Sequence, residues 1–231
     1  MDAGQHVSRS QPPLSLADPT TQALLALTFV TGIVDAVAFL GLGQVFAAMQ
    51  TGNVIFLGFG IAGTAGSPVA DPLVGLAAFI AGSGIAAALL RRSGRRGPSL
   101  GLAMTIEVLL LGGVAIAATV SEPRKGTLFA LVLIAGLSLS MGLRNTLARQ
   151  FGGANLATTV LNLTLTAVST PSAASVAGSG DLALRGSALL AILAGALSGA
   201  LLLKTSLSLA IAAAAAIALT VLLVHTSRRR S

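Results

Sequence analysis

The chain is a succession of apolar runs, each about as long as a helix that crosses a lipid bilayer. A hydrocarbon core of roughly 30 Å needs about 20 apolar helical residues per crossing. With 54% hydrophobic residues, 9% charged residues and a mean hydropathy of +0.90, an ordinary soluble surface is excluded. The sequence therefore predicts an all-α, multi-pass membrane protein. Its apolar segments are, approximately, 21–43, 45–64, 72–90, 99–120, 127–147, 155–171, 184–203 and 205–225.

Few residues are available for catalysis, metal binding or nucleic-acid binding. Cys is absent, and the two His residues, His6 and His225, lie at opposite ends of the chain. Since this leaves no metal-ligand cluster, no thiol nucleophile and no Ser–His pair, we expect no enzyme activity and no cofactor. The basic residues behind the net charge of +7 lie in loops and tails, which is typical of membrane orientation signals rather than of a nucleic-acid partner. The lipid bilayer is the expected partner, and homo-oligomerisation is left open.

The first four apolar segments recur as the last four. At a shift of 110 residues, Thr28, Gly32 and Asp35 align with Ser138, Gly142 and Asn145, and IAGSGIAAALLR (Ile80–Arg91) lies on LAGALSGALLLK (Leu193–Lys204) with a small gap. Weak internal symmetry of this kind is typical of transporter folds. We therefore predict two membrane repeats, 21–120 and 127–225. The alternative is that helices rich in Ala, Leu and Gly merely share a composition.

The distribution of Lys and Arg indicates which segments cross. If every apolar segment crosses, the basic residues divide seven against seven, whereas cytoplasmic loops should carry an excess. If the second and sixth segments enter and leave by the same face, eleven are cytoplasmic and only Arg124, Lys125 and Lys204 are outside. This favours six crossings plus two re-entrant or broken helices. Three crossings in each half make the repeat an inverted one.

The two tails fit this topology. Residues 1–20 are polar, contain Pro and lack the basic-then-apolar build of a cleavable signal peptide. They predict a disordered cytoplasmic tail, and residues 226–231 form a basic C-terminal tail that is also expected to be cytoplasmic.

Polar residues interrupt the second segment in the stretch MQTGNVIF, Met49–Phe56. Non-helical backbone at membrane depth is tolerated only inside protein or beside a wet cavity. We predict a turn here, in which Gly52 takes a positive φ, Asn53 caps the turn and Thr51 bonds the freed backbone. The sixth segment holds the counterpart residues Thr158, Thr159 and Asn162. The alternative is that these side chains hydrogen-bond between neighbouring helices.

Two carboxylates lie inside apolar segments. Thr28, Thr31, Gly32 and Asp35 share one helix face, and Glu107 lies in the fourth segment without a polar stripe around it. A charged side chain near mid-membrane costs roughly 2.5–3.5 kcal/mol, so it often marks an ion or substrate path. The alternative for both is a protonated or hydrogen-bonded residue that packs helices together.

Arg144 adjoins Asn145, the repeat counterpart of Asp35, near the predicted cytoplasmic end of the fifth segment. One interpretation is an orientation signal that snorkels to the membrane surface. The other is a charge partner, which either pairs with Asp35 or meets an anionic substrate. Gly195 and Gly199 form a GxxxG pattern that we interpret as a helix-packing face.

The stretches GIVDAVAFLGLGQVFAAMQTGNVIFLG and SMGLRNTLARQFGGANLATT resemble the two signature stretches of the YoaK-type family, bacterial inner-membrane proteins with a domain of unknown function. Asp35, Gly41, Thr51, Gly52 and Asn53 match the family's Asp, its Gly-rich turn and its Met-Thr-Gly-Asn element, which is interrupted here by Gln50. In the second stretch Arg144 stands where the family more often has an uncharged polar residue, and Leu161 and Asn162 replace a Thr-Gly. The resemblance implies a location in the bacterial inner membrane and a membrane fold, but no substrate.

Together these features favour a carrier or permease for a small solute, in which the two broken segments meet near the middle of the membrane. In a proton-coupled version Asp35 carries the proton, and a passive channel is a variant. The alternative is a non-transporting membrane scaffold or partner-binding subunit. The predicted substrate or ion path contains Asp35, Thr51, Gly52, Asn53, Glu107, Asn145, Thr158, Thr159 and Asn162, with Arg144 as a charge partner.

Overall fold

The computed structural model describes residues 16–64, 66, 68–92, 100–121, 123–149 and 179–227. Within these residues every regular element is a helix, so the all-α prediction is confirmed there. The predicted sixth segment, 155–171, lies outside them. The elements are α1 (Pro19–Ala36), the π-helix η1 (Val37–Leu42), α2 (Gln50–Ile61), α3 (Ala70–Arg92), α4 (Leu100–Val120), α5 (Leu128–Ala148), α8 (Ser179–Leu203) and α9 (Leu207–Ser227).

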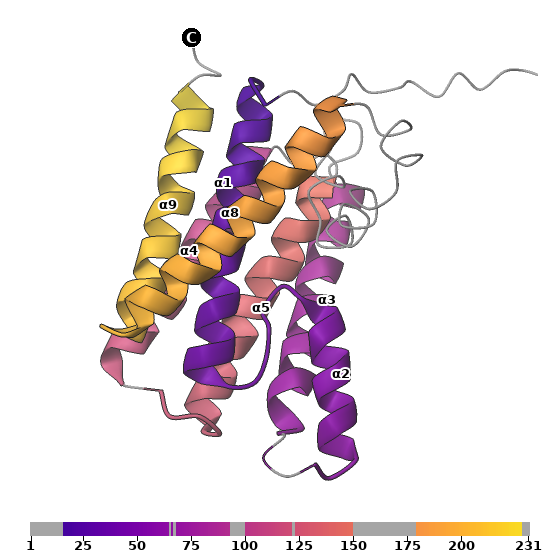
Figure 1. Cartoon of the computed structure of the whole chain (residues 1–231), viewed down its shortest axis with the longest axis vertical. Coiled ribbons are helices and arrows are strands. Elements are labelled where there is room, and N and C mark those ends of the chain that lie inside the picture. The colour runs from indigo at the N-terminus through magenta and orange to yellow at the C-terminus, as the bar shows by residue number, and fades with distance from the viewer. Residues whose placement is uncertain are drawn as a thin grey trace, which may run out of the picture.

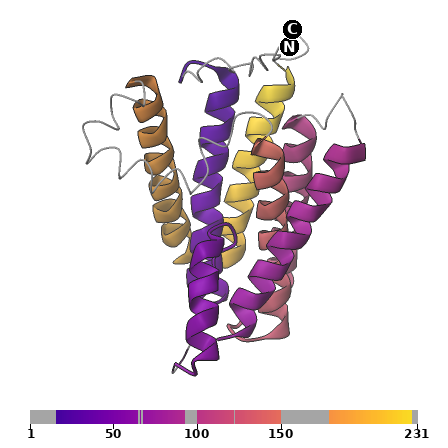
Figure 2. The ribbon, with the colours of Figure 1, turned by 90° about the vertical axis from the view of Figure 1, so that its right-hand side faces the viewer.

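The helices form a bundle with two ends (Figures 1 and 2). We call the end where α1 begins and α9 ends the upper end. The lower end holds the α4–α5 connection and the turn between α8 and α9. Between these ends α1, α3, α4, α5, α8 and α9 run in alternating directions.

Five helical stretches of the described chain are long and apolar enough to cross a membrane: Pro19–Leu42, Ala70–Arg92, Leu128–Ala148, Ala183–Leu203 and Leu207–Val224. The apolar part of α4, Met104–Val120, is shorter. Large apolar side chains such as Leu109, Val120 and Leu128 are exposed on the outside of the bundle, where lipid would cover them. The chain is therefore a multi-pass membrane protein.

Side chains cap the N-terminal ends of α1 and α5. The carboxylate of Asp18 accepts a hydrogen bond from the Thr21 N–H at 3.1 Å, and Pro19 occupies the first helical turn of α1. At α5 the Thr127 hydroxyl accepts from the Ala130 N–H at 3.2 Å. Both caps satisfy backbone donors that the helix itself leaves free.

The interruption after α1 lies earlier than the sequence predicts. α1 continues into the π-helix η1, and the chain is then irregular through Gly43–Met49 before α2 begins at Gln50. The expected turn at Thr51, Gly52 and Asn53 is wrong, because these residues form the first turn of α2. Gly52 is not among the glycines with positive φ. The helix can begin there because the Asn53 side chain bonds the irregular segment instead of a turn around itself.

Helix α2 has 12 residues, about 18 Å of helix, well short of a bilayer core. After η1 the chain turns back into the bundle, α2 begins near mid-height, and it descends to the same lower end at which η1 finishes (Figures 1 and 2). Gly43 permits this path because a Cβ there would overlap the carboxylate of Asp71 in α3. The second segment thus forms a half-length helix that packs along α3 at the edge of the bundle, with only Asn53 buried.

Helix pairs with small residues at their contacts build the bundle. α1 packs along α8, α3 along α5, and α4 along α9. At the α1–α8 contact, Gly32 and Gly195 lie so close to the facing backbone that neither has room for a Cβ. At the α3–α5 contact, Gly82 and Gly142 likewise lie too close to the facing backbone to have room for a Cβ. We call these two contacts the glycine seams, and they are helix-packing faces of the small-residue type.

Candidate functional site

The structure buries three of the predicted path residues and leaves others outside the core. Asp35, Asn53 and Glu107 are buried, whereas Asn145 and Gly52 are half-buried and Thr51 is exposed. The three predicted residues of the sixth segment, Thr158, Thr159 and Asn162, lie outside the described residues.

Asp35 and Asn53 hold the irregular segment in place. The Asp35 Oδ1 accepts a hydrogen bond from the Ala48 N–H at 2.8 Å. The Asn53 side chain accepts from the Phe46 N–H at 2.8 Å and donates to the Phe46 carbonyl at 2.7 Å. The same Asn53 amide donates to the Gln50 Oε1 at 2.8 Å. Side chains therefore satisfy backbone groups that lipid could not, which is the condition for irregular backbone inside a membrane.

Four phenylalanines cover this segment. The rings of Phe39 and Phe46 stack at a centroid distance of 4.9 Å, and Phe56 lies 5.7 Å from the first and 5.9 Å from the second. Phe59 continues the cluster at 6.3 Å from Phe56. Since the rings come from η1, the irregular segment and α2, they add apolar packing to the hydrogen bonds of Asn53.

Arg144 is the centre of a second polar group. Its guanidinium donates to the Glu107 Oε1 at 2.7 Å, to the Leu27 carbonyl at 2.9 Å, to the Thr31 hydroxyl and to the Met141 sulfur at 3.2 Å. Arg144 thereby joins α5 to α4 and to α1. It is buried, so the interpretation as a snorkelling orientation signal is wrong. Its guanidinium is held by partners on α1, α4 and α5 instead.

The charge partner of Arg144 is Glu107 rather than Asp35. Asp35 lies one helical turn below Thr31 on α1 and is close enough to Arg144 to interact with it electrostatically. The buried cation is therefore paired with one buried carboxylate, Glu107, while Asp35 lies on the next turn of α1 beyond Thr31. The sequence pointed to both residues, because Glu107 and Arg144 are the single charged residues of α4 and α5. It did not predict that the two side chains pair with each other.

Each carboxylate uses only part of its hydrogen-bonding capacity. Asp35 Oδ2 and Glu107 Oε2 are buried and have no hydrogen-bond partner within the described part of the chain. The hydroxyls of Ser138 and Ser140 on α5 are in the same state. Buried polar groups without partners are rare in proteins, and here they gather on the helices around Arg144. The arrangement can bind a proton, a cation or a polar solute.

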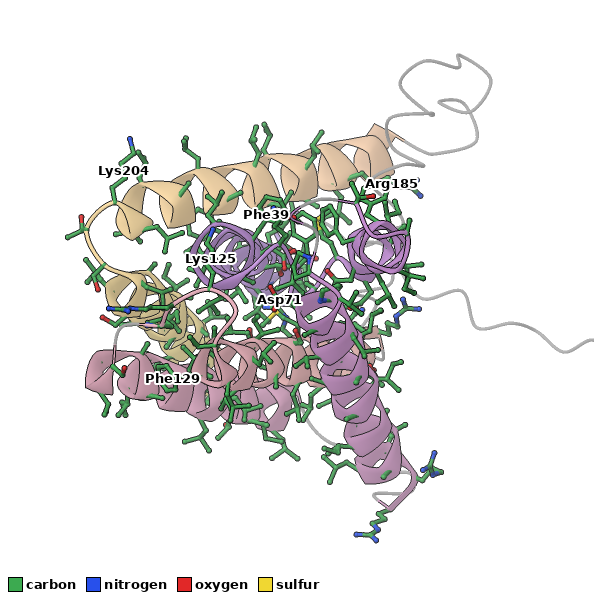
Figure 3. All side chains as sticks on the ribbon, turned by 90° about the horizontal axis from the view of Figure 1, so that it is seen from below. Phe39, Asp71, Lys125, Phe129, Arg185 and Lys204 are labelled. Carbon is green, nitrogen blue, oxygen red and sulfur yellow. The ribbon has the colours of Figure 1, made fainter. Side chains whose placement is uncertain are left out.

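Asp71 is a further buried carboxylate, which lies at the lower end. In Figure 3, which shows the bundle from below, Asp71 lies toward the middle of this face, whereas Lys204 points outward from α8. Asp71 packs against Gly43, where the irregular segment begins. It therefore lies beside the start of the irregular segment at the lower end and does not belong to the Arg144 group.

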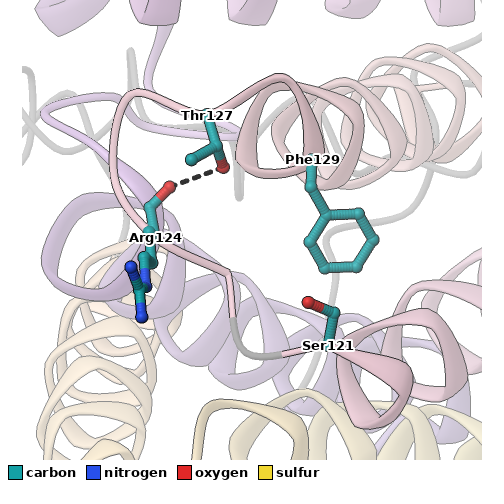
Figure 4. A pocket seen from close by; sticks show the side chains of 4 residues that line it. All are labelled: Ser121, Arg124, Thr127 and Phe129. Atoms are coloured by element: carbon teal, nitrogen blue, oxygen red, sulfur yellow. Dashed lines mark hydrogen bonds between the residues drawn. The ribbon is translucent and has the colours of Figure 1, made fainter.

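Two cavities open at the lower end, away from the predicted path. One, of about 420 Å³, is lined by Ser121, Arg124, Thr127 and Phe129, and there the Thr127 hydroxyl donates to the Arg124 carbonyl at 2.7 Å (Figure 4). The other, of about 630 Å³, lies between Leu40 and Gly41 of the π-helix and the α8–α9 turn around Lys204. Over the described residues, no three His, Cys, Asp or Glu side chains are grouped to hold a metal ion.

The comparisons with known proteins place the chain in a family. The model of the family described as Protein of unknown function (DUF1275) matches residues 23–224. The UPF0700 transmembrane protein YoaK of Bacillus subtilis (strain 168) is 34% identical over 148 residues. That match covers 63% of this chain and 63% of the relative, so it spans less than two thirds of either protein. No solved structure matches significantly. The chain therefore belongs to the YoaK-type family of transmembrane proteins, whose function is unknown.

Proposed function

We propose that this protein is a proton-coupled carrier of a small solute, built as an inverted repeat that crosses the bacterial inner membrane six times. The observation that carries the proposal is the half-length helix α2. In its first turn the buried Asn53 bonds the irregular segment, which is itself anchored to the buried carboxylate of Asp35. Broken helices with their ends at mid-membrane and buried ionisable groups beside them are typical of the substrate and ion sites of secondary transporters.

The contacts at the glycine seams support the inverted repeat. At the α1–α8 seam the helices touch through the backbone of Phe29 and Ile192, and at the α3–α5 seam through Leu139 and Phe79. A shift of 110 residues carries Phe29 onto Leu139 and Gly32 onto Gly142, and after the small gap a shift of 113 carries Phe79 onto Ile192 and Gly82 onto Gly195. The two seams are thus equivalent, and each joins one helix from each half.

Helix directions support the same proposal. α1 and α5 run in opposite directions, as do α3 and α8, and α4 and α9 (Figures 1 and 2). Counterparts of opposite direction are what an inverted repeat requires. In this arrangement α4, with 21 residues, is the sixth crossing.

The basic residues support the orientation. Arg124, Lys125 and Lys204 lie in the two connections at the lower end, whereas Arg91, Arg92 and Arg149 lie at the upper ends of α3 and α5. In this topology the sequence places its excess of basic residues on the side to which these upper ends belong, which the orientation rule assigns to the cytoplasm.

Cysteine labelling tests the path of α2, because the natural chain contains no Cys. We expect single cysteines at Gln44 and Thr64 to react with a membrane-impermeant maleimide added outside intact cells. A cysteine at Arg92, at the far end of α3, should be protected until the membrane is opened. If Gln44 and Thr64 report opposite sides, α2 crosses and the six-crossing topology is wrong.

Proton movement in proteoliposomes tests the carrier. A pH-sensitive dye inside the vesicles should respond when one class from a panel of carboxylates, amino acids, sugars and inorganic ions is added outside. Asp35→Asn should abolish this response while the protein still folds, because Asn keeps the acceptor for the Ala48 N–H but cannot bind a proton. Asp71→Asn is the matched control and should keep the response, since Asp71 is also buried but packs against Gly43 at the lower end, outside the Arg144 group. Silence for the whole panel would favour the non-transporting scaffold.

A further inference from the structure

We propose that Arg144 is the binding residue for a small monocarboxylate, and that Glu107 is an internal carboxylate that occupies the guanidinium when the solute is absent. This inference rests on the carrier function proposed above and names its substrate class. It follows from the burial, the contacts and the charges of the Arg144 group.

Arg144 is placed where the two halves of the chain meet. Among the side chains that the structure describes, it is the only buried basic one. It extends from α5 to the Leu27 carbonyl and Thr31 on α1 and to Glu107 on α4. A cation in such a place must have an anionic partner, because an unpaired charge in the membrane interior is strongly unfavourable.

Glu107 is an incomplete partner. It bonds the guanidinium through Oε1 alone, and its Oε2 is buried without a hydrogen-bond partner within the described chain. A guanidinium and a carboxylate pair best through two parallel hydrogen bonds, which this geometry does not provide. The side chain of Arg144 is 10% exposed and that of Glu107 is 0% exposed, so the cation is the more accessible member of the pair.

A solute that displaces Glu107 from Arg144 must supply the same group as Glu107, which is a single carboxylate. Charge balance then requires a proton. When the solute carboxylate binds Arg144, Glu107 is left beside one cation that is already neutralised, so it must take up one proton. The site gains one anion and one proton, and its net charge does not change.

Within the part of the chain that the structure describes, the helices around Glu107 carry few other groups that could hold this proton. α5 contributes only Arg144 as a charged residue, and α1 contributes only Asp35, which interacts with Arg144. α9, which packs along α4, has no charged residue from Leu207 to Val224. Among the described residues, Asp35 and Glu107 are therefore the two candidates to hold this proton, and Glu107 is the one in direct contact with the binding cation.

Binding of radiolabelled acetate to the purified full-length protein in detergent tests the proposal. We expect saturable binding that acetamide does not compete for and that chloride competes for weakly. Because one proton enters with each acetate, the Kd measured between about pH 6 and pH 8 should rise with pH, by at most about tenfold per pH unit. Glu107→Gln should lower the Kd by at least about tenfold and remove most of this pH dependence, because the internal competitor is gone.

Several outcomes would overturn the proposal. These are the absence of acetate binding, equal competition by chloride, and a wild-type Kd that does not change with pH. Acetate binding by Glu107→Gln that is no tighter than that of the wild type would do the same. If Glu107→Gln does not fold, the pH dependence of the wild type decides alone. If acetate does not bind but another solute drives proton movement in proteoliposomes, the substrate class is rejected and the carrier function stands. If neither assay gives a response, both the substrate class and the carrier function are rejected.

Discussion

Arg144→Met should lower the free energy of unfolding by about 3–5 kcal/mol, because it leaves the Glu107 carboxylate buried without its cation. It also removes the donor for the Leu27 carbonyl and the Thr31 hydroxyl, which are the contacts that hold α5 to α1. Unfolding in denaturing detergent, followed by circular dichroism, measures this loss. Circular dichroism is the suitable signal because the chain has no tryptophan whose fluorescence could be followed.

The matched control is the double variant Arg144→Met with Glu107→Met. Replacing both members of a buried ion pair by apolar residues of similar size is often neutral, so the double variant should recover most of the stability that the single variant loses. It should still bind no acetate, because it has no guanidinium. Equal losses in the single and double variants would mean that Glu107 is not held by Arg144.

The second large loss of stability is expected from alanine substitutions at the glycine seams. Gly82→Ala and Gly142→Ala should each lower the free energy of unfolding by about 1–3 kcal/mol, because the new Cβ meets backbone that cannot rotate away. This loss should outweigh the gain of up to about 1 kcal/mol that alanine brings to a helix. The same denaturing-detergent titration measures it.

Gly84→Ala, two residues further along α3, is the control. A Cβ there meets nothing within 4 Å, so this variant should be neutral or slightly more stable. Because the seams are counterparts in the proposed repeat, Gly32→Ala and Gly195→Ala should lose about as much as the α3–α5 pair. A large loss at one seam and none at the other would argue against their equivalence.

Hydrophobicity and charge patterns made much of the fold predictable. The apolar runs predicted the described helices, since a bilayer core imposes a length and a composition on every helix that crosses it. The segment that contains MQTGNVIF was also correctly predicted to be interrupted. The position of the interruption was wrong by several residues, because Gly52 and Asn53 were expected to form a local turn, while the structure has Asn53 bonding the backbone of Phe46 across the irregular segment.

The Arg144 group was the part that the sequence did not predict. Arg144 and Glu107 are 37 residues apart in the chain, and either could have been satisfied at the membrane surface or by protonation. Their pairing depends on how α4 and α5 pack, which the apolar faces of these helices leave almost unconstrained because lipid-facing and protein-facing residues are equally apolar.

Membrane insertion, helix identity and the family thus follow from composition and motifs along the chain, because the bilayer acts on each segment separately. The partner of each buried charge does not follow from them. Tertiary packing alone decided that Asp35 holds the segment before α2, that Glu107 holds Arg144, and that the glycines of one half lie against the backbone of the other. The physical reason is that a buried polar group must find a partner wherever the fold offers one, and its own segment does not determine where that is.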